Sequence, residues 1–149
     1  MRNAICKTVA AAAALALAGQ VLAGGFYLSL GNPDASPEAR KLNAVLTIQA
    51  TGCHDPATAQ LSATAIGMVS GQRREIPLKV LPLSSPGMFA LARQWPNQGR
   101  WVIKLVARNG EQFTNSLVAA GPEGIDRLHD RANIREFTAA DVDSLLQLR

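Results

Sequence analysis

Alternation of apolar and polar residues through the middle of the chain is the feature that most constrains its fold. Leu46 and Ile48 fall on one face of an extended chain, while Thr47 falls on the other. Turn formers such as Asn109-Gly110 interrupt the pattern at short intervals. The strands predicted in this way are Asn43–Thr51, Ala57–Ile66, Ile76–Val80, Met88–Trp95, Arg100–Arg108 and Gln112–Ala120, with Phe26–Leu30 as a further one.

Strands of this length and spacing predict an all-β fold, namely an immunoglobulin-like β-sandwich of about six or seven strands with a C-terminal α-helix. Pro77 and Pro82 lack the amide donor that a central strand needs, so the strand around them is expected at a sheet edge. Trp101 lies in the most regular strand and is predicted to fill the core. The segment Gly67–Arg74 is polar and is expected to form a turn.

The segments on either side of the sandwich, which we place at residues 43–120, differ from it in pattern. Residues 24–42 predict a strand followed by a linker or short helical turn. Residues 121–149 predict an irregular segment with a short helix around Ile125–Asp130 and then a terminal helix. Thr138 and Asp141 have the spacing of a capping box at the start of that helix. We expect the helix to pack on the sandwich, with docking on a partner as the alternative.

The first 23 residues have the features of a signal peptide. Arg2 and Lys7 give a basic start, Val9–Ala18 is a short apolar run, and Ala23 suits signal peptidase. Cleavage after Ala23 predicts a periplasmic or secreted protein without a membrane span. The alternative is an uncleaved N-terminal anchor.

Charge and cysteine content exclude several classes of protein. The chain has 15 Lys+Arg against 11 Asp+Glu, and the charges are scattered, which predicts no nucleic-acid partner. Of the 2 cysteines, Cys6 lies in the predicted signal, so Cys53 has no partner for an internal disulfide. The core is therefore expected to hold the fold together without cross-links.

Residues suited to catalysis are scarce. The chain has 2 histidines and contains no G-x-S-x-G, H-E-x-x-H or C-x-x-C motif. Asp141 and Asp143 are two residues apart on the predicted helix and therefore point in different directions. The sequence predicts a protein that is not an enzyme and that works by binding.

Cys53 and His54 form the one constellation that suits a metal. A thiolate and an imidazole are good ligands for soft metals, copper(I) above all, and Asp55 or a methionine (Met68 or Met88) could complete the shell. The alternatives are a buried structural cysteine beside the turn His54-Asp55-Pro56, or a thiol that acts in redox chemistry or pairs between chains.

A second candidate site is the loop from Trp95 to Gly99. Aromatic residues at loop mouths often contact ligands, so Trp95, Asn97 and Gln98 are candidate partner-binding residues. The partner expected for them is an unidentified envelope protein or ligand.

Pro86–Ala107 (PGMFALARQWPNQGRWVIKLVA) resembles the bacterial YtkA-like and FixH-like β-sandwich domains. The shared features are Gly87 and Phe89 in one strand and Gly99 and Trp101 at the start of the next. The resemblance implies a β-sandwich outside the cytoplasm, in the setting of copper handling or cytochrome oxidase assembly. The main hypothesis is thus an exported, non-enzymatic accessory or interaction module of the cell envelope. The alternatives are a soft-metal (copper) binding protein and a thiol-dependent redox protein.

Overall fold

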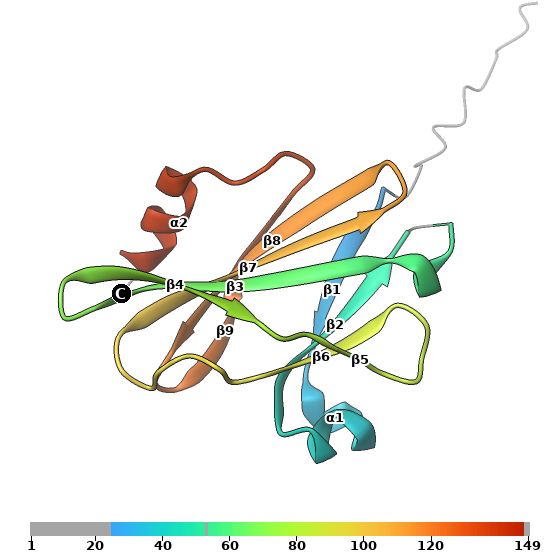
Figure 1. Ribbon diagram of the computed structural model, residues 1–149, viewed down its shortest axis with the longest axis horizontal. Coiled ribbons are helices and arrows are strands. Elements are labelled where there is room, and N and C mark those ends of the chain that lie inside the picture. Colours follow the sequence, from blue (N-terminus) through green and yellow to red (C-terminus); the bar gives the residue numbers. More distant parts are fainter. Residues whose placement is uncertain (1–24, 53, 148–149) are drawn as a thin grey trace, which may run out of the picture.

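A computed structural model describes residues 25–52 and 54–147 and has two antiparallel sheets packed face to face (Figure 1). The first has the order β1-β2-β6-β5, with β1 at Tyr27–Gly31, β2 at Ala44–Thr51, β6 at Met88–Ala92 and β5 at Leu81–Pro82. The second has the order β4-β3-β7-β8-β9, with β4 at Gln72–Leu78, β3 at Gln60–Val69, β7 at Arg100–Asn109, β8 at Gln112–Gly121 and β9 at Gly124–Asn133.

The strand order confirms the predicted immunoglobulin-like sandwich. In their order across the sheet, β1, β2, β6 and β5 occupy the places of strands A, B, E and D of that fold. On the opposite sheet β3, β7 and β8 occupy the places of C, F and G, and β4 is an added C′ strand. The last strand, β9, extends the sheet beyond the G position and becomes its edge.

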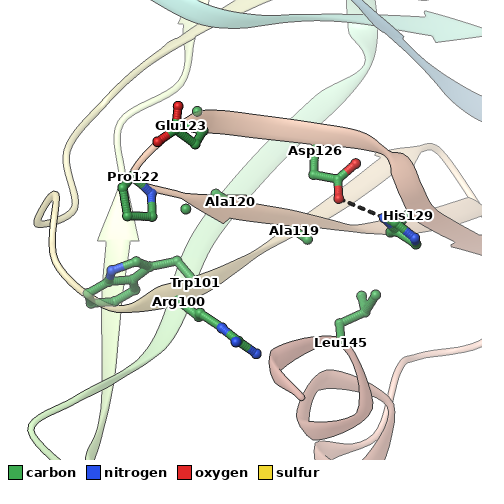
Figure 2. A pocket seen from close by; sticks show the side chains of 11 residues that line it. Arg100, Trp101, Ala119, Ala120, Pro122, Glu123, Asp126, His129 and Leu145 are labelled. Atoms are coloured by element: carbon green, nitrogen blue, oxygen red, sulfur yellow. Dashed lines mark hydrogen bonds and ion pairs between the residues drawn. The ribbon is translucent and has the colours of Figure 1, made fainter. Parts of the chain in front are cut away.

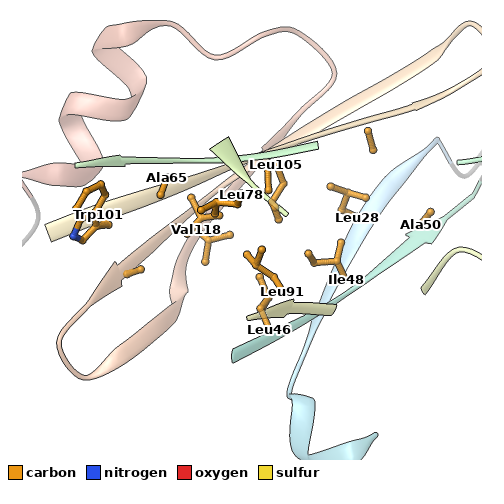
Figure 3. Packing of buried hydrophobic residues seen from close by; sticks show 14 of the residues in the cluster. Leu28, Leu46, Ile48, Ala50, Ala65, Leu78, Leu91, Trp101, Leu105 and Val118 are labelled. Atoms are coloured by element: carbon orange, nitrogen blue, oxygen red, sulfur yellow. The ribbon is translucent and has the colours of Figure 1, made fainter. Parts of the chain in front are cut away.

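The main core lies between the sheets and follows the alternation in the sequence (Figure 3). Trp101, Ile103 and Leu105 of β7 are at most 1% exposed, as predicted. They face Leu46 and Ile48 of β2, which are fully buried. Burying a side chain of this size stabilises the fold by about 1.5–3 kcal/mol, so this layer supplies the stability that disulfides would otherwise give.

The predicted turn at Gly67–Arg74 is wrong in extent, because β3 runs on to Val69 and β4 begins at Gln72. The turn itself is the two residues Ser70 and Gly71, both with positive φ (50° and 78°). Positive φ at both positions is the signature of a type I′ hairpin turn. The segment Gly67–Arg74 is polar, so the sequence pattern did not indicate that the strands continue into it.

The segment 32–42 confirms a short helical turn. It contains a 3-10 turn, η1 (Pro33–Ala35), and a short helix, α1 (Pro37–Lys41), capped by the Ser36 hydroxyl. The Glu38 carboxylate accepts hydrogen bonds from the N–H and the hydroxyl of Ser84. These bonds lower the pKa of Glu38 and fix the β5–β6 hairpin to the N-terminal segment.

The predicted irregular segment with a helix at Ile125–Asp130 is wrong, because this part of the chain forms strand β9. Its register against β8 shifts between Leu117 and Ala119. The residues inside that irregularity break the alternation by which a strand is predicted from sequence. The strand therefore gave no periodic signal.

The terminal helix α2 (Ala139–Leu146) has the predicted capping box. The Thr138 hydroxyl accepts from the N–H of Asp141, and the Asp141 carboxylate accepts from the N–H of Thr138. The helix lies over the outer face of the five-stranded sheet (Figure 1). There it closes a second, smaller core, whose buried members are Ile66, Val102, Leu117, Phe137, Val142 and Leu145.

Candidate functional site

The predicted metal site lies in the loop between β2 and β3. Cys53 is outside the described residues, and His54 is exposed. Asp55 stabilises the loop through two hydrogen bonds. Its carboxylate accepts one from the N–H of Ala57, and its backbone carbonyl accepts one from the side-chain amide of Asn109 at 2.7 Å. The described residues contain no group of three His, Cys, Asp or Glu side chains able to hold a metal. Metal binding by Cys53 and His54 stays a prediction.

The two candidate methionines lie at different distances from this loop. Met88 lines the same hollow as Ala57, and Gly87 packs directly against Pro56. Met68 is eight residues along β3 from Gln60, which places it about 27 Å from the loop at the rise of an extended strand. Of the two, Met88 is therefore the one placed to complete a shell there.

The predicted partner-binding loop is divided between the core and the surface. Trp95 is only 5% exposed and belongs to the main core. The Arg93 guanidinium lies over its ring, 5.7 Å from the centroid. Asn97 and Gln98 are exposed, although the Gln98 carbonyl accepts from the Trp101 indole at 2.9 Å. A partner at this loop would meet Asn97 and Gln98 without reaching the indole of Trp95.

Among the described residues, the two most exposed large apolar side chains lie on and next to β9. Leu128 is 92% exposed and Ile134, just after the strand, is 79% exposed. The next most exposed large apolar side chain, Tyr27, is 47% exposed. Single exposed apolar residues are ordinary, but an aliphatic side chain as exposed as Leu128 on an edge strand, with a second one just after the strand, makes this edge a candidate contact surface.

Leu128 stands on a bulge that we call the knuckle, residues 127–130. Asp126 pairs with Ala119 and Arg131 pairs with Leu117, so the four knuckle residues stand opposite Val118 alone. The extra residues push the chain outward from the sheet edge. The sequence thus places an almost fully exposed leucine within the irregular part of β9.

The Asp126 carboxylate stabilises the knuckle by contacting two of its residues, Leu128 and His129. It accepts a hydrogen bond from the N–H of Leu128 at 2.9 Å and lies 2.6 Å from Nδ1 of His129 (Figure 2). These two contacts, the one to His129 first, lower the pKa of Asp126. Asp126 therefore holds the turn that presents Leu128.

A pocket of about 320 Å³ lies between the knuckle and the end of α2 (Figure 2). Trp101, Ala120 and Leu145 give it an apolar lining, and Arg100 and His129 add N–H groups. Arg100 also donates to the carbonyl of Leu146 at 3.2 Å and so ties β7 to the helix. Of the described residues, no Ser, Thr, Cys or Lys lines this pocket, so His129 has no nucleophile there to activate.

Reasoning from the sequence missed the knuckle as a candidate site. The signal available was the run DRLHDR (residues 126–131), in which one leucine stands among five charged or titratable residues. A leucine surrounded by charged residues has few apolar neighbours to pack against within its own segment, so its exposure could have been considered from the sequence.

Comparisons with known proteins give no match: no protein-family model fits the chain, and no curated protein or solved structure is significantly similar to it. The resemblance to YtkA-like and FixH-like domains therefore stays a prediction. In the part of the chain that the structure describes, no helix has the length and apolar character needed to cross a membrane.

Proposed function

We propose that this chain is an exported, non-enzymatic β-sandwich module of the bacterial cell envelope that works by binding a partner through the free edge of β9. The observation that carries the proposal is the exposure of Leu128 (92%) and Ile134 (79%) on that edge. Fully burying a side chain of this kind is worth about 1.5–3 kcal/mol. A partner that buries both side chains can therefore gain this free energy of burial, which the isolated chain does not.

The chemistry at this edge supports binding over catalysis. Asp126 and His129 contact each other and stabilise the knuckle, and both are at least partly exposed to solvent. A general acid–base pair is useful when it is held against a reacting group in a water-excluded site. The exposed Asp126–His129 pair is explained by its structural role in the turn, and no catalytic role is needed to account for it.

Export is supported by the basic start, the apolar run and the small residues before Gly24. The test is the mass of the protein recovered from the envelope of a bacterium that expresses the full chain. A mass that begins at Gly24 is expected. A mass that includes residues 1–23 would show that the signal is not cleaved and would favour an anchored protein over a free one.

The binding surface is tested by the native size of the protein in an envelope extract. The wild-type chain is expected to migrate in a species larger than the monomer, and the double variant Leu128→Ser/Ile134→Ser is expected to migrate as the monomer. The matched control is Leu42→Ser/Met68→Ser, which removes two apolar side chains that are also exposed (36% and 40%) but lie elsewhere. Equal behaviour of the two double variants would contradict the proposal.

Soft-metal binding is the second candidate, and the position of Met88 beside the loop of Cys53 and His54 favours it. Thioether, thiolate and imidazole are the ligand types that suit copper(I). The test is a copper(I) competition titration of the reduced protein against a colorimetric chelator, beside Cys53→Ser and Met88→Leu. One tight equivalent that both substitutions weaken is expected. No competition by the wild type would end this hypothesis.

A further inference from the structure

The charges around Leu128 are arranged with opposite signs about one point. In the run DRLHDR (residues 126–131) the order is acid, base, two uncharged positions, acid, base, with His129 taken as neutral. A two-fold axis passing between residues 128 and 129 places Arg127 of one copy opposite Asp130 of the other. The next pair out, Asp126 and Arg131, is related in the same way. The run is thus complementary in charge to itself in the antiparallel direction.

The inner two charges are available for such contacts. Arg127 and Asp130 are exposed, and neither forms an ion pair with another residue that the structure describes. The outer two are already engaged within the chain. Asp126 holds His129, and Arg131 donates to the Ser144 hydroxyl at 2.8 Å. The pairing between copies therefore depends on Arg127 and Asp130.

Leu128 also lies beside a recess with apolar residues that could accept a leucine side chain. A recess of about 490 Å³ runs between the edges of the two sheets, with Leu30 of β1 and Ile125 of β9 as apolar members. Leu128, Arg127 and Asp130 border the same recess. A projecting side chain next to a hollow is a self-complementary patch, because a two-fold axis brings each projection to the hollow of the other copy.

The knuckle argues against an added β-strand as the occupant of this edge. Continuous strand addition needs a row of free N–H and C=O groups along the edge. Here four residues stand opposite one residue of β8, and the N–H of Leu128 is already donated to Asp126. A contact made by side chains across a two-fold axis is compatible with this geometry.

We infer that the partner at the β9 edge is a second copy of this chain, in a two-fold dimer in which Leu128 of each copy enters the recess beside Leu30 of the other and Arg127 pairs with Asp130 across the axis. The inference rests on the proposed function, because it names the partner of that same surface. The dimer buries two leucines and forms two exposed ion pairs, so its affinity is expected to be modest.

Sedimentation equilibrium of the exported protein, with charge-swapped variants, tests the inference. Arg127→Asp and Asp130→Arg each turn both ion pairs of the homodimer into like-charge contacts. Each single variant is expected to raise the dimer dissociation constant about tenfold or more. An equimolar mixture of the two is expected to form heterodimers as tight as the wild-type dimer, because both contacts are then between opposite charges.

Two further variants complete the test. Arg74→Asp on β4 removes an arginine that is also exposed, from the opposite edge, and is expected to leave dimerisation unchanged. Leu128→Ser is expected to weaken it about tenfold or more. Wild-type protein that stays monomeric up to about 1 mM, or a dimer whose mixed variants show no recovery, overturns the inference. A monomer that still enters a larger envelope species through Leu128 and Ile134 would leave the proposed function intact with another partner.

Discussion

The two edge strands of the five-stranded sheet differ: β4 is regular along its length, whereas β9 is interrupted by the knuckle that carries Leu128. Arg73 of β4 forms ion pairs with Glu75 and with Asp143 of α2. Pro77 removes an amide donor from the same strand. Charges and proline are the usual means by which an edge strand avoids pairing with another chain.

The edge at β9 is protected differently, by the knuckle that interrupts its register. That protection prevents strand pairing yet leaves an aliphatic side chain in water. Two leucines make the difference plain, since Leu78 on β4 is 8% exposed and Leu128 on β9 is 92% exposed. The same residue type serves folding at one edge and is free for contact at the other.

Truncating Leu78 should give the largest effect on stability. Leu78→Ala is expected to lower the free energy of unfolding by about 2–4 kcal/mol, because it leaves a cavity in the main core. Urea denaturation measures this loss, and Leu128→Ala is the matched control. Equal losses in the free energy of unfolding would contradict the claim that Leu78 serves the fold and Leu128 does not.

Glycines next to the two edge strands should differ in the same direction. A Cβ on Gly67 of β3, which pairs with Arg74 of β4, would clash with the Trp101 ring. Gly67→Ala is therefore expected to cost about 1–3 kcal/mol by overpacking. Gly121 of β8 pairs with Gly124 of β9 and has open space around it. Thermal unfolding of Gly121→Ala should show a much smaller change.

Replacing Leu128 itself should separate stability from contact. Leu128→Ser is expected to change the free energy of unfolding by less than about 0.5 kcal/mol, since the side chain is already in water. Urea denaturation measures this, beside the self-association described above. A loss of several kcal/mol would show that the leucine belongs to the fold of the isolated chain.

Acid should loosen the knuckle, because the Asp126 carboxylate that holds it loses its charge. The pKa of Asp126 is lowered from its ordinary 3.8 in the folded state, so its hydrogen bonds are fully present above that value. They are lost as the pH falls through the lower folded pKa. Amide exchange of Leu128, whose N–H donates to Asp126, is expected to speed up there relative to the intrinsic rate. Unchanged protection at Leu128 below the folded pKa of Asp126 would argue against this role of Asp126.

The sequence predicts the parts of the fold in which local pattern and burial agree. The alternation of Trp101, Ile103 and Leu105 predicted β7, and the spacing of Thr138 and Asp141 predicted the start of α2. Both follow from short-range geometry that any extended strand or capped helix must satisfy.

The remaining features depend on contacts between distant segments. Trp95 lies beside a proline turn, where aromatic residues often contact ligands, yet it is buried in the main core. The knuckle exists because β9 must match the register of β8 at both of its ends. Its exposed leucine was visible in the sequence, but the strand that carries it was not.

The most direct test of the account is a photo-crosslinking amino acid placed at position 128 or at position 74 of the full chain in living cells. Both positions are exposed, one on each edge of the same sheet. The account predicts a discrete adduct from position 128, at the mass of two copies if the partner is this chain, and none from position 74. An adduct from position 74 alone, or from neither position, would contradict it.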